Sequence, residues 1–130
     1  MPAPDLIVFN KAHDLVVAVY RVTKSFPWNE ELGLTAQLRR AAASIPSNIV
    51  EGRAKSSPKE LRRHLDIAHG SIAEVEYQLR LARDLGYLND DDWQIRDAAA
   101  QEISRMLSTF KRTVERQTRR ISQKLVARSS

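Results

Sequence analysis

The sequence contains no cysteine, and this absence excludes several classes of protein. Without thiols there is neither a disulfide framework nor a thiolate metal site, so a reducing, intracellular setting is the natural expectation. Glycine is scarce, with four residues in 130, and aromatic residues make up 6% of the chain. Both shortages argue against an all-β fold. The periodic stretches are dominated instead by alanine, leucine, arginine and glutamate, which favour helices.

A targeting signal and a membrane-spanning segment are also missing. The stretch from Met1 to Asp5 has neither the basic nor the apolar region of a signal peptide, and no apolar run approaches the roughly 20 residues that cross a bilayer. We therefore expect a cytoplasmic protein without membrane contact. With 130 residues and 42% apolar content, the chain is long enough for one core and too short for two ordinary domains. A single domain over residues 1–130 is predicted.

Hydrophobic periodicity predicts four helices, over about residues 8–25, 31–51, 58–85 and 90–125. The second should kink or divide at Pro46 and end at Gly52. The third has Ser57 as its N-cap and ends at Gly86, and the fourth starts at Asn89. Short connections favour antiparallel neighbours, so the expected fold is an all-α, up-down-up-down four-helix bundle. The fourth helix is the longest and should extend beyond the others.

The third predicted helix carries apolar residues on two opposite faces. A ladder at spacings of four and three forms its core face: Leu61, Leu65, Ala68, Ile72, Val75, Leu79 and Ala82. At about 100° per residue, Ile67, Gly70, Tyr77 and Leu81 fall on the far side, where a monomer would be polar. This second face could line a ligand cleft, but an interface with another copy explains it more simply. We predict a homo-oligomer.

The positive charge is concentrated at the C-terminal end of the chain. The formal net charge is +5, from 21 Lys and Arg against 16 Asp and Glu. Residues 1–104 hold 13 basic and 15 acidic side chains, a balance of −2, whereas residues 105–130 hold 8 basic and one acidic, a balance of +7. This asymmetry predicts an anionic partner for the C-terminal segment, and nucleic acid is the commonest candidate.

Four arginines of this segment lie opposite the expected core residues of the fourth helix. The core residues are Ile103, Leu107, Phe110, Val114 and Ile121. The arginines are Arg105, Arg112, Arg116 and Arg119, flanked by Lys111, Arg120 and Lys124. Guanidinium groups at intervals of one and two turns suit a run of phosphates, and the lack of interleaved aromatics argues against base stacking. The alternative is a solvated face, or one that pairs with acidic residues of a neighbouring subunit.

Two polar clusters of the second helix have a functional and a structural interpretation. Arg39 and Arg40 could extend the basic surface, but a salt bridge to a carboxylate of the first or third helix is the simpler expectation. Asn48 and Glu51 follow Pro46 and could form a polar site. We expect them instead to satisfy the backbone groups that the proline leaves unpaired.

Little in the chain points to catalysis. His64 and His69 are about 140° apart around their helix, so they cannot converge on one metal ion without a second helix, and His13 is remote in sequence. The Glu-x-x-His pair of di-iron bundles is absent, because Arg63 stands three residues after Glu60. No glycine-rich phosphate loop or nucleophile elbow occurs. We expect no enzymatic activity, no metal and no cofactor.

Part of the second helix resembles the signature of a bacterial family. Residues 34–52 read LTAQLRRAAASIPSNIVEG, and shorter matches lie at 11–15, 59–60, 68–71 and 85–88. Together they resemble the four-helix bundle proteins, also called 23S rRNA intervening-sequence proteins. One departure is visible, since the family usually has a tryptophan near Phe9 and Asn10.

The resemblance implies a ring-like homo-oligomer, typically a pentamer, of antiparallel four-helix bundles. The family includes the accessory variability determinants of diversity-generating retroelements, which bind a reverse transcriptase and its nucleic acid. Other members are encoded inside ribosomal RNA genes and have no settled role. Two functions therefore stay open: an accessory protein that binds RNA or DNA, partnered with a reverse transcriptase, or a protein-interaction scaffold without affinity for nucleic acid.

Overall fold

The computed structural model describes residues 1–129, which form four α-helices and one short 3-10 helix and contain no strand. The α-helices are α1 (Ala3–Thr23), α2 (Leu34–Ala54), α3 (Pro58–Asp84) and α4 (Asp90–Ser129), and the 3-10 helix η1 (Trp28–Glu30) follows α1. The predicted all-α class with four helices is confirmed.

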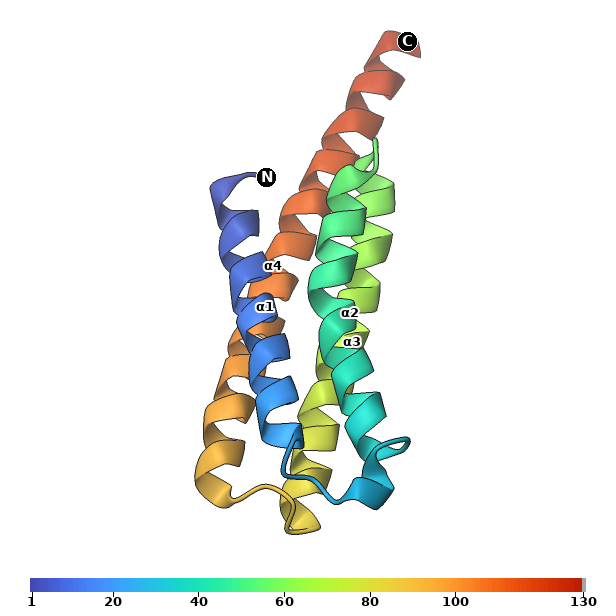
Figure 1. Cartoon of the computed structure of the whole chain (residues 1–130). Coiled ribbons are helices and arrows are strands. Elements are labelled where there is room, and N and C mark those ends of the chain that lie inside the picture. The colour runs from blue at the N-terminus through green and yellow to red at the C-terminus, as the bar shows by residue number, and fades with distance from the viewer. Residues whose placement is uncertain (130) are drawn as a thin grey trace.

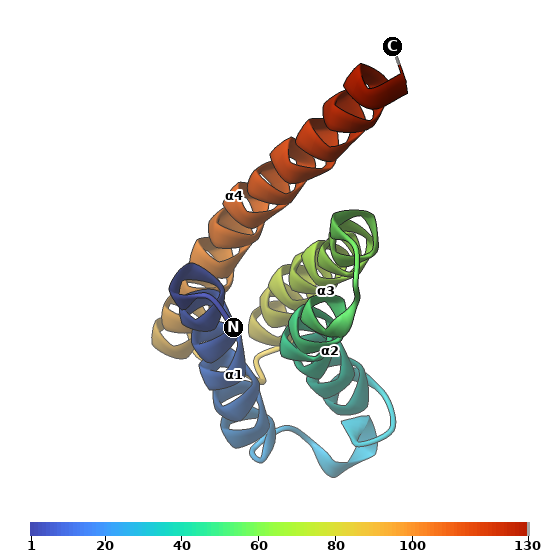
Figure 2. The same ribbon diagram turned by 90° about the horizontal axis from the view of Figure 1, so that it is seen from above.

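The helices pack side by side around one core. α1 contacts α2 and α4, and α3 contacts α2 and α4. Figure 1 shows the N-terminus and the C-terminal part of α4 at one end of the molecule, and the α1–α2 and α3–α4 connections at the other. From above, in Figure 2, α4 continues well past the other helices, as predicted. We call residues 115–129, which follow the last buried residue Val114, the overhang.

The core consists of the apolar ladders that the sequence predicts, with one exception. The seven ladder residues of α3 are all buried, and α2 buries a similar series at spacings of four and three, namely Leu34, Leu38, Ala41, Ile45 and Ile49. On α4 the buried ladder runs from Ile103 to Val114. Ile121 was wrongly predicted as a core residue. It is 47% exposed, because it lies on the overhang, beyond the part of α4 that packs against the bundle.

Side-chain caps start α3 and α4 where the sequence predicts them. At the start of α3, the Glu60 N–H donates to Ser57 Oγ at 3.2 Å. At the start of α4, the Asp92 N–H donates to Asn89 Oδ1 at 2.8 Å. Each cap satisfies one of the backbone N–H groups that have no partner within the helix.

Gly86 follows α3 with a φ of +79°, a conformation that L side chains rarely adopt. The Gly86 N–H donates to Arg83 O and the Tyr87 N–H to Ala82 O, both at 2.9 Å. These are the two hydrogen bonds of a Schellman motif, so the predicted role of Gly86 is confirmed.

Two helices differ in their bounds from the prediction. α1 begins at Ala3 rather than near residue 8, because Pro4 in the first turn needs no hydrogen-bond partner for its nitrogen, and it ends at Thr23. α2 begins at Leu34 rather than residue 31, because η1 and a turn occupy residues 28–33.

Pro46 does not divide α2, which is one helix from Leu34 to Ala54. The carbonyl that faces its missing N–H belongs to Ala42, by the helical spacing of four. Asn48 Nδ2 donates instead to Ser44 O at 2.8 Å, so the expected repair of the backbone by Asn48 was wrong. Pro46 is accommodated within the helix without that side-chain contact.

Gly52 also lies inside α2, not after it as predicted. A Cβ atom at this position would come within 2.8 Å of Leu61 Cδ1 and 2.9 Å of His64 Cβ, both on α3. Carbon atoms in contact normally lie about 3.5–4.0 Å apart. The glycine therefore lets the last turns of α2 approach the first turns of α3.

Candidate nucleic-acid interface

The predicted arginines are exposed to solvent on the side of α4 opposite its buried residues. We call Arg105, Arg112, Arg116 and Arg119 the arginine stripe; all four are exposed, as is Arg120. None of these side chains forms an ion pair within residues 1–129, and Arg112 Nη2 donates only to the Thr109 hydroxyl, at 3.3 Å. Their charges are thus available to an anion outside the subunit.

Lys111, predicted to flank the arginines, points elsewhere. Its Nζ lies 3.0 Å from Asp66 Oδ1 and 3.0 Å from His69 Nδ1, and its side chain is 19% exposed. Both partners belong to α3, so Lys111 helps to join α3 to α4 instead of contacting a ligand. Its assignment to the phosphate-binding set was wrong.

The contact between α3 and α4 is a chain of charged groups. Arg62 is paired with Glu115 of α4 and, at 3.2 Å, with Asp66, which in turn meets Lys111. Burial raises the pKa of Asp66, but hydrogen bonds and charges from Lys111 and Arg62 outweigh it, so the pKa lies below the usual value. Asp66 therefore stays ionised at neutral pH and holds both cations.

Within this contact between α3 and α4, His69 most resembles a catalytic base, because its Nε2 lies 3.1 Å from Ser104 Oγ. The Lys111 ammonium can only donate a hydrogen bond, so His69 Nδ1 accepts it and Nε2 carries the ring proton. Burial and the charge of Lys111 lower the pKa of His69, which favours this neutral form. A base that activates Ser104 would need a free Nε2, so the geometry is that of a structural contact.

Neither a metal site nor a membrane span is found in the structure. Among residues 1–129 there is no group of three or more His, Asp or Glu side chains that could hold a metal ion. Over the same range, no helix combines the length and the apolar content that crossing a bilayer requires.

The second face of α3 is mostly open to solvent. Tyr77 is 64% exposed, Ile67 is exposed, and nothing lies within 4 Å of the position that a Cβ on Gly70 would take. Leu81 differs, because it is partly buried against the core of its own subunit. Three of the four predicted interface residues are therefore free to meet another chain.

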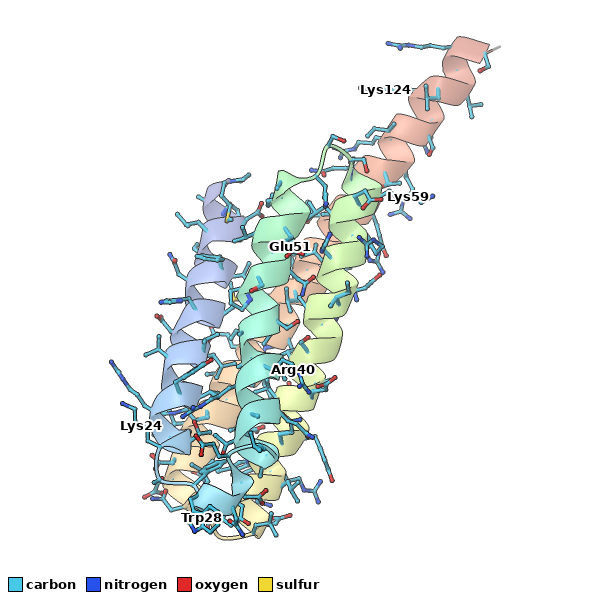
Figure 3. The ribbon with its side chains drawn as sticks, turned by 45° about the vertical axis from the view of Figure 1, so that its right-hand side comes forward. Lys24, Trp28, Arg40, Glu51, Lys59 and Lys124 are labelled. Atoms are coloured by element: carbon cyan, nitrogen blue, oxygen red, sulfur yellow. The ribbon has the colours of Figure 1, made fainter. Side chains whose placement is uncertain are left out.

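Arg39 contacts α1 through hydrogen bonds, not through the predicted salt bridge. Its Nε donates to Thr23 Oγ1 at 2.8 Å, and its guanidinium lies 4.6 Å from the centre of the Tyr20 ring. Arg40, labelled on α2 in Figure 3, is exposed. Arg39 therefore joins two helices, and of this pair only Arg40 is open to solvent.

Asn48 and Glu51 both face His64 of α3. His64 Nδ1 lies 3.0 Å from Asn48 Oδ1 and 3.7 Å from a carboxylate oxygen of Glu51. The Ser71 hydroxyl donates to Ser44 Oγ at 2.8 Å in the same contact. This polar network fixes α2 against α3 and leaves no open site.

A cavity of about 470 Å³ opens at the end of the bundle where α4 leaves it. Its lining comes from the N-terminal residues, the last turn of α2 and the outer part of α4. Asp5 is 7% exposed and forms an ion pair with Arg53, whose guanidinium carbon lies 5.1 Å from the centre of the Phe110 ring. Arg105 of the arginine stripe also lines the cavity.

Sequence reasoning missed Asp5 and Arg53 altogether. Their contact joins positions 48 residues apart, and neither lies in a motif. The only available signal was weak: Arg53 is a charged residue directly after the apolar ladder of its helix. Such a pairing becomes visible only once α1, α2 and α4 are placed in space.

Comparison with known proteins assigns the chain to a family. The family model of the 23S rRNA-intervening sequence proteins matches residues 4–109, which is most of the chain. The protein belongs to this family. A crystal structure from the S23 ribosomal protein family of Bacteroides thetaiotaomicron, a protein of unknown function, has a TM-score of 0.78 and 23% sequence identity, and it covers 84% of this chain and 98% of that one. No curated protein matches the chain significantly.

As a 23S rRNA-intervening sequence protein, the chain shares its fold with its structural neighbour. The match to the family ends before most of the arginine stripe. The family model stops at residue 109, and within the arginine stripe it includes only Arg105. Arg112, Arg116 and Arg119 lie beyond it. Family membership therefore explains the bundle and says nothing about the charge of the overhang.

Proposed function

We propose that the protein is a cytoplasmic, non-enzymatic accessory protein that binds the phosphates of RNA or DNA through the arginine stripe of α4. The observation that carries this proposal is the placement of the four arginines. They are exposed and free of ion pairs within residues 1–129, on a helix that projects beyond the bundle. The rest of the basic surface is partly neutralised, since Lys111, Arg53 and Arg62 are paired with carboxylates.

We further propose that the subunit is an up-down-up-down bundle that assembles into a ring-like homo-oligomer, a pentamer, through the second face of α3. Several copies of the arginine stripe on one particle would multiply weak contacts into tight binding. A reverse transcriptase is the protein partner that the resemblance to retroelement accessory proteins implies. A reverse transcriptase gene and a template repeat next to this gene would support that partner, and an insertion within a 23S rRNA gene would argue against it.

Replacing Arg105, Arg112, Arg116 and Arg119 together by Gln tests the phosphate contacts. Affinity for a single-stranded or double-stranded oligonucleotide should fall at least about tenfold, and the plot of log affinity against log salt should become shallower by about 3 to 4, because each phosphate contact releases condensed counterion. Fluorescence anisotropy between about 50 and 200 mM salt measures both quantities.

A matched control removes four exposed charges from another surface. Arg21, Lys24, Arg40 and Lys55 lie on α1, on α2 and just after these helices, and all are exposed. Changing these four to Gln alters the net charge equally and should leave most of the affinity. Equal losses in both variants, or an unmodified protein that does not bind at about 50 mM salt, would favour the alternative, a scaffold that docks an acidic protein on the stripe.

Tyr77→Glu tests the proposed interface. A carboxylate buried without a partner at a subunit contact is strongly unfavourable, so the dissociation constant of the oligomer should rise at least about tenfold. Light scattering and sedimentation report the mass, and circular dichroism should show unchanged helicity. Ile7→Glu is the control, because Ile7 is a comparably exposed apolar residue on α1, which does not contact α3. A monomeric unmodified protein at micromolar concentration contradicts the assembly.

A further inference from the structure

The cavity beside α4 has the size and walls of a small-molecule site. Its volume of about 470 Å³ falls within the range of roughly 300–1,000 Å³ that is usual for ligand pockets. The walls are apolar, from Val8 on α1 and from Met106, Phe110 and Val114 on α4. Such sites usually combine an apolar surface with a few placed polar groups, which orient the ligand.

The polar groups of this cavity are an ion pair with an unsatisfied donor. Asp5 is paired with Arg53 Nη2, and the Arg53 Nε–H is buried without any hydrogen-bond acceptor in residues 1–129. Burial lowers the pKa of Arg53, which reflects the removal of its guanidinium from water. The Arg53 side chain is 29% exposed, so its outer N–H groups, rather than the buried Nε–H, are open to an acceptor on a bound ligand.

Asp5 and Arg53 place a hydrogen-bond acceptor next to donors. The edge of adenine that carries N7 and the 6-amino group has the complementary pattern, an acceptor beside a donor. The Watson–Crick edge of guanine also fits, because its O6 accepts beside the N1–H and N2–H donors, so either purine can pair with both side chains. A pyrimidine has one ring and would fill less of the apolar volume.

The rim of the cavity supplies the contact for a phosphate. Arg105 lines the cavity and is also the first residue of the arginine stripe, so a strand that follows the stripe passes the opening. We propose that the cavity holds a purine base, with Asp5 and Arg53 at its edge and Arg105 on its phosphate. This deepens the proposed function and rests on it for the source of the base, an unstacked nucleotide of the bound strand.

Calorimetric titration of the full chain with AMP tests the cavity directly. AMP and GMP should each bind about tenfold or more tightly than UMP or inorganic phosphate, because a purine buries more apolar surface in the cavity than a pyrimidine does. AMP that binds no more tightly than inorganic phosphate overturns the proposal.

Substitutions in the cavity locate the site. The double variant Asp5→Leu with Arg53→Met removes the donors and the acceptor together, so no unpaired charge is left buried. Met106→Trp fills the space from a different wall and keeps the ion pair. Each should weaken AMP binding at least about tenfold while circular dichroism shows a folded protein. Unchanged AMP affinity in a folded variant of either kind overturns the assignment of the cavity.

Single substitutions of Arg105 and Arg112, both in the arginine stripe, test the proposed phosphate contact at the rim of the cavity. Arg105→Gln should weaken AMP binding, whereas Arg112→Gln, which lies outside the lining, should leave it unchanged. Oligonucleotide binding that depends on the stripe, without any AMP binding, overturns the purine site alone. AMP binding that depends on Asp5 and Arg53, in a protein without affinity for oligonucleotides, supports the site and overturns the proposed function alone.

Discussion

Leu107→Ala is expected to lower the free energy of unfolding by about 2–5 kcal/mol, whereas Ile121→Ala should change it by less than about 0.5 kcal/mol. Both residues belong to the same apolar ladder of α4. Leu107 is completely buried, so truncation removes its contacts and leaves a cavity. Ile121 is half exposed on the overhang, so its truncation changes the free energy of unfolding only slightly. Urea denaturation followed by circular dichroism measures both values.

The comparison is best made in the Tyr77→Glu background, where subunit contacts at α3 do not contribute to stability. Similar losses for Leu107→Ala and Ile121→Ala would contradict a core that ends near Val114. They would mean that the overhang is covered in solution by something other than its own bundle.

Gly52→Ala is expected to lower the free energy of unfolding by about 1–3 kcal/mol, although alanine is the better helix former. The new methyl group would meet Leu61 Cδ1 at 2.8 Å and His64 Cβ at 2.9 Å. The leucine side chain can rotate away, but the His64 Cβ moves only with its backbone. Accommodation therefore requires α2 and α3 to separate, which disturbs the contact of Asn48 with His64.

Gly70→Ala is the matched control, since it makes the same change in the interior of a helix. Nothing lies within 4 Å of the added methyl group, so the subunit should gain up to about 1 kcal/mol from helix propensity. Thermal denaturation of the two variants side by side checks the prediction. Equal behaviour would contradict the close packing of Gly52, and a lower mass for Gly70→Ala in light scattering would support close approach of another chain at this point.

The ladders of the sequence predict the core well because burial repeats with the period of the helix. Every residue of the α3 ladder is buried, and the caps at Ser57 and Asn89 form as expected, since each depends only on residues three positions away. Gly86 is a further local case, because its backbone conformation alone determines its role. Features that depend on the nearest turn were therefore predictable.

Features that depend on a distant part of the chain were not. Gly52 looks like a helix end until Leu61 and His64 are placed against it. Lys111 sits beside the arginines on a helical wheel, and only the position of Asp66 shows that it faces α3. Periodicity also gave no sign of where the core stops along α4, because the length of the ladder says nothing about the length of its neighbours. Ile121 was misplaced for that reason.

The cavity is the extreme case of the same difficulty. It requires Asp5, Arg53 and Phe110 to meet from three helices, and no spacing along the sequence encodes that meeting. The exposure of the arginine stripe could be predicted because it depends on the period of one helix alone.

The overhang also makes the molecule an electric dipole. Residues 105–130 carry a balance of +7 and residues 1–104 a balance of −2, and the overhang extends about 22 Å past Val114 at 1.5 Å per residue. At physiological ionic strength, charges more than about 8 Å apart are largely screened from each other. The acidic bundle therefore does little to cancel the field at the tip of α4. A polyanion that comes within about 8 Å of the tip would therefore be attracted chiefly by the positive charge of α4 itself.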